Sequence, residues 1–217
     1  MNKFLNYLFI TAFALSAVFT SCKKDDDKNG NGNGNGNDGG ITELNVKAEN
    51  GSAYNSQVSA VKLLIDMAFS EDGGKITNLR GVPLTNDNFS NGGFSVKMPE
   101  TVSNQYLRKL SETFSGSNIS DNDAKGRWNG KFVGYDSSDE YVGGFYCEIP
   151  GKENIRIILF YVDRDVTVTG SSDESTFDCT FKKGWNWLYM INNLFTTKEQ
   201  GTMKWYFSTG SDWAIIK

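Results

Sequence analysis

The chain has 217 residues and a formal net charge of −4, from 22 Lys+Arg and 26 Asp+Glu, and it contains no histidine. The missing histidine excludes Ser-His-Asp and Cys-His catalytic arrangements and every His-ligated zinc, iron or copper site. The acidic balance argues against a nucleic-acid partner, which requires a basic face. With 38% hydrophobic residues, the chain is neither a disordered polyelectrolyte nor a multi-span membrane protein.

The first 21 residues have the pattern of a cleaved export signal. Lys3 is their only charged residue, and an apolar run follows from Phe4 to Phe19. This run is too short and wrongly flanked for a stable transmembrane helix, and it lies at the N-terminus, as secretory signals do. We expect residues 1–21 to be a signal peptide, with a single-span anchor as the alternative.

The segment ends in Phe19-Thr20-Ser21-Cys22. These residues resemble the lipobox of bacterial lipoproteins, although Phe19 stands where leucine is most usual. The resemblance implies that Cys22 is diacylated on sulfur, becomes the first residue after cleavage and is acylated again on its amine. Acyl chains such as palmitate anchor a protein firmly because each buried methylene contributes about 0.8 kcal/mol. We therefore expect a membrane partner, reached through lipid on Cys22.

A charged cluster, Lys23–Lys28, follows the cysteine and contains three consecutive aspartates. It resembles the surface-export signal of Bacteroidota lipoproteins. The resemblance implies an outer-membrane location with the protein facing outside the cell. The alternative is a solvated linker, which a run of charges usually forms.

Residues 29–40 alternate asparagine with glycine almost throughout and contain no apolar residue. Such a low-complexity sequence has nothing to bury in a core. We expect residues 22–40 to form the lipidated cysteine and a flexible tether. The 18 residues after the cysteine would span roughly 24 Å as a Gly-rich coil.

Residues 41–217 alternate apolar and polar positions, the pattern of half-buried strands. The clearest runs lie at residues 44–48, 94–98, 131–133, 145–149, 155–162, 166–169, 177–181, 185–191 and 203–208. Glycine-containing turn signals separate these runs. Many short strands at such spacing are typical of a sandwich or a barrel. We expect an all-β body, an antiparallel β-sandwich.

Two segments of the body are less regular. Val58–Phe69 fits either a helical stripe or a strand face, and the all-β surroundings favour a strand. Residues 103–114 indicate one short helix, with Ser103 as its cap and Gly116 just after its end. This helix is also the place where the body could divide into two β subdomains, near residue 117.

Three segments of the body carry a further resemblance. Asn91–Pro99, Tyr161–Gly170 and Lys182–Asn186 are similar to segments of small uncharacterised Bacteroidota lipoproteins, which are β-rich and have no known activity. The first segment also resembles the Gly-x-Phe strand of transthyretin-like modules in carboxypeptidase regulatory domains. The resemblance implies a transthyretin-like N-terminal half and says nothing of function.

Cys147 and Cys179 remain once Cys22 is lipidated. A disulfide between them is chemically permitted in an exported protein. Both cysteines lie beside phenylalanines on apolar strand faces, so two buried free thiols are the other interpretation, and the one we favour. A nucleophilic cysteine is disfavoured because no histidine can activate it.

Carboxylates could perform glycoside hydrolysis without histidine. Asp163 and Asp165 share one strand face, and Asp136 and Glu140 lie in an expected hairpin loop. Arg164 between the first pair indicates a polar strand junction instead. Residues 120–126 fail the pattern of a calcium loop, and the chain has no phosphate-binding or dinucleotide-binding motif. We therefore expect no catalytic residue, metal or cofactor.

All five tryptophans lie in the C-terminal half. Trp185, Trp187 and Trp205 share strand faces with other apolar residues and are expected in the core. Trp128 and Trp213 have polar neighbours and are the candidates for stacking on a sugar ring. We expect a non-catalytic lipoprotein that binds or scaffolds an extracellular glycan or protein. The alternatives are a glycan-binding accessory protein and, less favoured, a His-free glycoside hydrolase.

Overall fold

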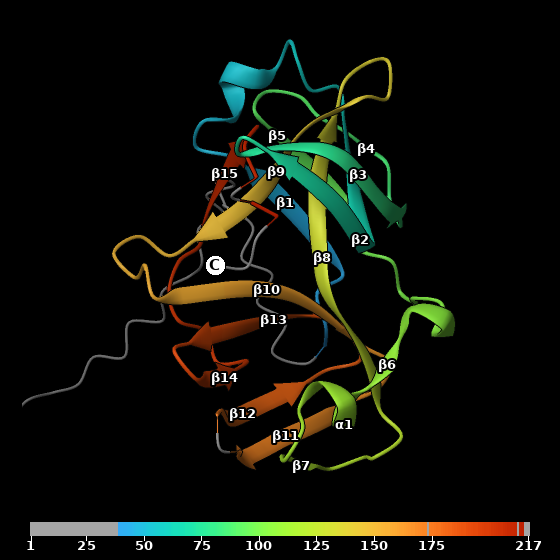
Figure 1. Cartoon of the computed structure of the whole chain (residues 1–217), viewed down its shortest axis with the longest axis vertical. Coiled ribbons are helices and arrows are strands. Elements are labelled where there is room, and N and C mark those ends of the chain that lie inside the picture. Colours follow the sequence, from blue (N-terminus) through green and yellow to red (C-terminus); the bar gives the residue numbers. More distant parts are fainter. Residues whose placement is uncertain (1–38, 173, 212, 215–217) are drawn as a thin grey trace, which may run out of the picture.

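The computed structural model describes residues 39–172, 174–211 and 213–214 (Figure 1). The expected signal peptide, Cys22 and the tether up to residue 38 lie outside the described residues. The described chain is mostly β, with one short α-helix, and forms a large mixed sheet and a small two-stranded sheet. No helix in these ranges is long and apolar enough to cross a membrane.

The regular elements are mostly short strands. In chain order they are β1 (Glu43–Lys47), η1 (Gly51–Tyr54), β2 (Ala60–Asp72), β3 (Lys75–Pro83), β4 (Asp87–Asn88), β5 (Gly93–Lys97), η2 (Asn104–Tyr106), β6 (Arg108–Lys109), α1 (Leu110–Thr113), β7 (Asn118–Ile119), β8 (Lys125–Tyr135), β9 (Tyr141–Glu148), β10 (Ile155–Val162), β11 (Val166–Ser171), β12 (Thr176–Phe181), β13 (Gly184–Ile191), β14 (Leu194–Thr196) and β15 (Lys204–Ser208).

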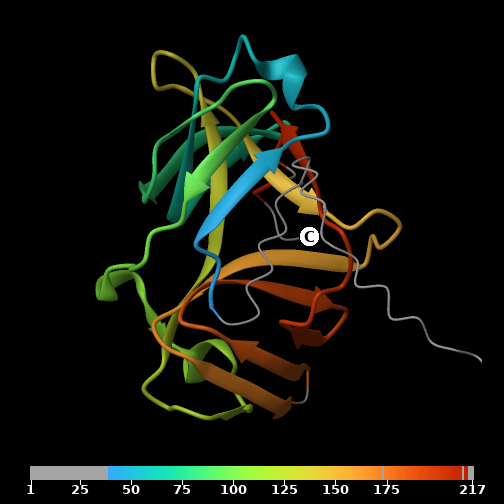
Figure 2. The same cartoon turned by 180° about the vertical axis from the view of Figure 1, so that it is seen from behind.

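The large sheet has the strand order β15-β9-β8-β10-β13-β14-β12-β11-β7. Its pairings are antiparallel except for the parallel pair β12–β14. β2 joins this path through β8 and carries β3 and β4 on its other side. The small sheet contains only β1 and β5, which run antiparallel side by side (Figure 2).

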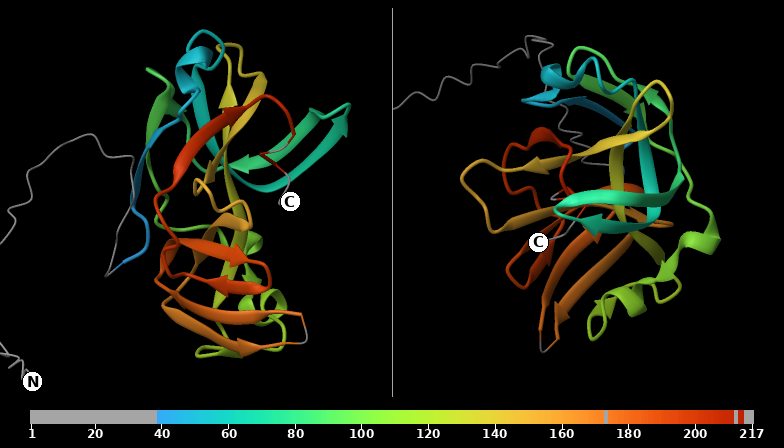
Figure 3. Two further views of the ribbon diagram at one scale, coloured as in Figure 1. Left: turned by 90° about the vertical axis from the view of Figure 1, so that its left-hand side faces the viewer. Right: turned by 45° about the horizontal axis from the view of Figure 1, so that its top comes forward.

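β8 links two parts of the large sheet. Its first half pairs with β10 and its second half with β2 and β9. A bulge interrupts the pairing with β10 between Arg127 and Gly130, and Asn129 there has a φ of 64°. Beyond its pairing with β8, the β2–β3 hairpin projects from the body (Figure 3, left).

The small sheet covers one face of the part of the large sheet that contains β2 and the second half of β8, the upper part in Figure 1. Leu44 and Val46 of β1 and Phe94 of β5 are buried in the same cluster as Leu63 of β2 and Phe132 of β8. The Phe94 and Phe132 ring centroids lie 5.1 Å apart. Apolar residues alternate on β1 and β5, so burial of this face fixes the register of the pair.

A second core lies in the lower part of the molecule, between α1 and the strands from β10 to β12. Phe114, directly after α1, is 1% exposed and contacts the rings of Phe160, Phe177 and Phe181. Phe160 and Phe181 also contact each other, with centroids 5.1 Å apart. The short helix and Phe114 after it therefore cover the apolar side chains of β10 and β12.

The structure decides both irregular segments. From residue 60 onward the segment 58–69 belongs to strand β2, which confirms the strand interpretation. The helix expected at 103–114 is wrong for most of its length, because only Leu110–Thr113 is α-helical. Its intended cap, Ser103, makes no side-chain capping bond.

Strand pairing explains this outcome. Arg108 and Lys109 pair with Gly126 and Lys125 of β8, so the backbone hydrogen bonds that a helix would need are used in a sheet. β2 and β8, which lie on either side of residue 117 in the sequence, also pair with each other.

Candidate functional site

Trp213 is not exposed, contrary to the expectation from its polar neighbours. Its side chain is 1% exposed, and its Nε1 donates a hydrogen bond to Tyr141 Oη at 3.1 Å. The ring lies directly over Gly144 of β9, where a Cβ would come within 2.0 Å of it. Trp213 thus fastens the C-terminal segment to the sheet and offers no ring to a ligand.

Trp128 is half-buried, and its ring packs against Phe114, Phe160 and Phe195 at centroid distances of 5.7, 5.3 and 6.0 Å. These contacts attach one part of the ring to the second core. Trp128 nevertheless lines a cleft of about 300 Å³ with Arg127. Of the three tryptophans expected in the core, Trp185 and Trp205 are buried and Trp187 is half-buried.

The two cysteines of the body are free thiols in this structure. Burial raises the pKa of Cys147 and of Cys179 to about 12. Cys179 Sγ donates to the carbonyl of Phe195 at 3.3 Å. Both thiols therefore stay protonated at neutral pH, which is the opposite of what a nucleophile requires.

The first candidate carboxylate pair serves local structure. Asp163 Oδ1 accepts from the Lys125 backbone N–H at 3.0 Å and pairs with Arg164. Asp165 accepts from the Lys183 backbone N–H at 2.8 Å and from Lys182 Nζ at 3.1 Å. The Lys183 N–H, and then the Lys182 ammonium, lower the pKa of Asp165, so this group is ionised and is a poor general acid.

The second candidate pair belongs to a turn. Asp136 Oδ1 accepts from the backbone N–H groups of Ser138 and Glu140 at 2.8 and 3.0 Å. This is the local bonding with which aspartate usually stabilises a loop. Among the described residues, no three His, Cys, Asp or Glu side chains come together as metal ligands.

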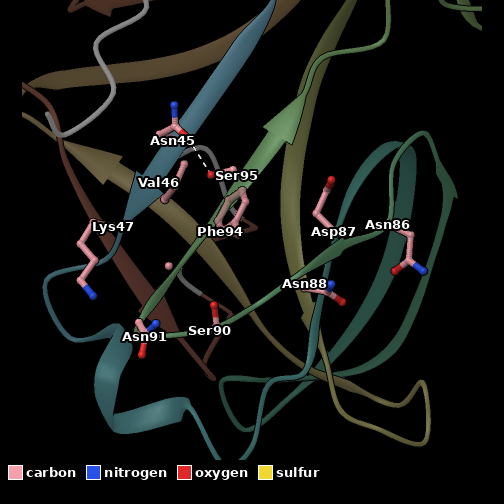
Figure 4. A pocket seen from close by; sticks show the side chains of 11 residues that line it. Asn45, Val46, Lys47, Asn86, Asp87, Asn88, Ser90, Asn91, Phe94 and Ser95 are labelled. Atoms are coloured by element: carbon pink, nitrogen blue, oxygen red, sulfur yellow. Dashed lines mark hydrogen bonds between the residues drawn. The ribbon is translucent and has the colours of Figure 1, made fainter. Parts of the chain in front are cut away.

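A different site stands out, which we name the asparagine groove. It is an open hollow of about 600 Å³ beside the small sheet, shown in Figure 4. The residues that line it are Asn45, Val46, Lys47, Asn86, Asp87, Asn88, Ser90, Asn91, Gly93, Phe94 and Ser95. Four of them are asparagines, and only Lys47 and Asp87 carry charge.

The strand pattern of the small sheet places one wall of the groove. Asn45 and Ser95 are paired in the register of β1 and β5, and both are exposed because their neighbours in sequence point into the core. Ser95 Oγ donates to Asn45 Oδ1 at 2.6 Å, as the dashed line in Figure 4 shows. This bond leaves the Asn45 amide N–H groups directed to solvent.

A tight turn and β4 form the rest of the groove. Asn91 has a φ of 52° and Gly92 a φ of 76°, the left-handed pair typical of a hairpin turn. Asn55 holds the turn, because its Oδ1 accepts from the Gly92 backbone N–H at 2.8 Å. On β4, Asp87 Oδ2 is buried and has no hydrogen-bond partner in the described protein. A buried acceptor of this kind is costly unless something donates to it.

Sequence reasoning missed this groove. The sequence pattern gives residues 86–90 no predicted role. Residues 91–93 fit a turn signal and begin the segment that resembles a transthyretin-like strand, and Asn45 fits the polar position of a strand. The density of asparagines in 86–91 was a signal, but the proximity of Asn45 to them depends on the pairing of β1 with β5. A scan against protein-family models and searches of curated proteins and of solved structures found no match to the chain.

Proposed function

We propose that this protein is a non-catalytic lipoprotein that binds a neutral saccharide through the asparagine groove. The observation that carries the proposal is that amide and hydroxyl side chains line one groove together with Asp87, whose buried carboxylate oxygen Oδ2 has no partner in the described protein. Each asparagine offers a carbonyl acceptor and two N–H donors, which match the paired donor and acceptor character of sugar hydroxyls.

The charge and size of the groove support the same ligand class. Lys47 and Asp87 balance each other, so nothing in the groove selects for a net charge on the ligand. A volume of about 600 Å³ lies within the usual range of small-molecule sites. A ligand hydroxyl that donates to Asp87 Oδ2 would also satisfy that buried oxygen.

The proposed location rests on the sequence. Lipid on Cys22 would hold the protein in the outer membrane, and the acidic cluster behind it supports display on the cell surface. A tether up to residue 40 would then let the groove reach ligands outside the cell. Binding outside the cell, without turnover of the ligand, is consistent with carboxylates that are used in turns and strand junctions.

We further propose that the body is a β-sandwich whose N-terminal half is transthyretin-like. The packing of β1 and β5 over β2 and β8 supports two layers. The segment that carries the resemblance, Asn91–Pro99, contributes β5 to the covering layer.

Binding of the full chain to a panel of neutral polysaccharides tests the proposed function. Affinity electrophoresis selects a ligand, and calorimetry then compares Asn45→Ala, Asn88→Ala and Asp87→Asn with the unaltered protein. Each should weaken binding by roughly 5- to 10-fold, the loss of about one hydrogen bond. Asn78→Ala is the matched control, because Asn78 is exposed on β3 and lies outside the groove.

Two outcomes would overturn the proposal. One is the absence of binding to every neutral polysaccharide of the panel. The other is binding that the three groove variants and Asn78→Ala affect equally.

A further inference from the structure

A second cleft, which we name the cationic cleft, opens where β2 separates from β8. The last pair that joins these strands is Leu64 and Lys131. Beyond it, β2 continues into the projecting hairpin (Figure 3), while β8 turns to pair with β10. The space between them, about 300 Å³, is lined by Asp66, Met67, Phe69, Arg108, Gly126, Arg127, Trp128, Asn129, Lys131 and Ala214.

Irregular backbone on both strands forms the cleft. The register of β2 with β3 shifts between Ile65 and Ala68, and Asp66 there has a φ of 53°. On β8, the bulge residue Asn129 has a φ of 64°. Left-handed backbone is unfavourable for residues other than glycine and is often found at binding sites. The two bulges direct both strands away from each other.

The cleft has an excess of positive charge. Arg127 pairs with Asp66, but within the described part of the chain neither Arg108 nor Lys131 has an ion-pair partner. Lys131 is half-buried, and desolvation lowers the pKa of its amine. The protein as a whole carries a charge of −4. A local cationic site on an acidic protein attracts anions selectively.

Two buried polar atoms of the cleft have no partner in the described protein. They are Arg127 Nε, a donor, and Asn129 Oδ1, an acceptor. Arg127 is already oriented by its bonds to Asp66 and to the carbonyl of Tyr106, so its remaining N–H has a fixed direction. A fully ionised anion such as sulfate or acetate could accept from Arg127 Nε but has no donor for Asn129 Oδ1. A ligand with both an anionic group and hydroxyls could satisfy both.

We propose that the cationic cleft binds an acidic saccharide, one that carries a carboxylate or a sulfate. The anion pairs with Lys131 and Arg108 and accepts from Arg127 Nε, while a sugar hydroxyl donates to Asn129 Oδ1. Phe69, 37% exposed at the rim, gives the sugar an apolar contact. This site is separate from the asparagine groove and shares no residue with it.

Calorimetry on the full chain tests this site with six probes. They are tetragalacturonic acid, which carries carboxylates, a chondroitin sulfate disaccharide, which carries a sulfate as well as a carboxylate, a neutral galactose tetramer, acetate, sulfate and polyglutamate. We expect one of the two acidic saccharides to bind, more weakly as salt is added. Arg108→Gln and Lys131→Met should each reduce its affinity about 10-fold or more, because hydrogen bonds to charged groups are strong.

Lys109→Gln is the matched control, since Lys109 is exposed beside Arg108 and does not line the cleft. Arg108 is exposed, so Arg108→Gln should retain the fold and tests the site independently of the half-buried Lys131. The proposal fails if neither acidic saccharide binds, or if Arg108→Gln and Lys109→Gln behave alike. Equal binding of the neutral tetramer, of acetate or sulfate, or of polyglutamate would overturn the assignment to acidic saccharides. Variants of the asparagine groove leave this test unaffected, so the two proposals can fail separately.

Discussion

Replacement of Gly144 by alanine should detach the C-terminal segment from the sheet. A Cβ at Gly144 would lie 2.0 Å from Trp213 Cδ2 and 2.3 Å from Cε3, where ordinary contacts are 3.4 to 4 Å. The ring would therefore have to retreat by about 1.4 Å or more. That displacement breaks the bond from Trp213 Nε1 to Tyr141 and opens the cluster that includes Leu64 and Val133.

The expected cost follows from what the ring loses. Removal of a buried tryptophan costs about 3–5 kcal/mol, and we expect Gly144→Ala to forfeit about 3 kcal/mol of the same packing. For a chain of this size the loss corresponds to a fall in Tm of about 6–12 °C. In a Trp213→Ala background the clash is absent, so Gly144→Ala should cost about 0.5 kcal/mol. The coupling energy is then about 2–3 kcal/mol.

Urea unfolding followed by far-UV circular dichroism measures all four proteins of this cycle. Gly39→Ala is the control, since no atom lies within 4 Å of a Cβ placed there. The reasoning is refuted if Gly144→Ala is as mild as the control. It is refuted equally if the substitution costs the same with and without Trp213.

Three further predictions concern other parts of the chain. Cys22→Ser should abolish incorporation of labelled palmitate and move the protein out of the membrane fraction; unchanged labelling would exclude lipid on that residue. Burial raises the pKa of Cys147 and Cys179 to about 12, from 9.0 in the unfolded chain. The contribution of these two thiols to the free energy of unfolding should therefore be fully present below pH 9 and be lost as the pH rises toward 12. Rapid reaction of the native thiols with Ellman's reagent at pH 8 would contradict the raised pKa. Lys131→Met should raise the free energy of unfolding by about 1–2 kcal/mol, because an unpaired ammonium is costly to bury. The same variant should weaken anion binding. A loss of stability in urea unfolding would instead show that Lys131 supports the fold.

The strands could be predicted where burial imposes a period of two. Phe94 and Val96 point inward from β5, as their alternation indicates. The nearly continuous apolar run of 155–162 is β10, buried on both faces from Ile158 onward. These predictions succeeded because the pattern is local and one face of each strand is covered.

Features that depend on distant partners could not be predicted in this way. The stretch 103–114 has helical spacing, but Arg108 and Lys109 within it pair with β8. Trp213 has polar neighbours in sequence, yet Gly144 leaves a place for its ring some seventy residues away. The asparagine groove and the cationic cleft likewise combine residues of separate strands, and only the topology brings them together.

The small sheet also determines how the body bears mechanical load. The chain enters the fold at Ile41, whose N–H donates to the carbonyl of Trp185 at 2.6 Å, and then runs directly into β1. Five residue pairs join β1 to β5. A pull on the N-terminal segment along β1 shears these pairs together instead of unzipping them one by one. Because Asn45 lies on β1, a force that arrives from this end loads the bond of Ile41 to Trp185 of β13 first and then reaches the asparagine groove along β1.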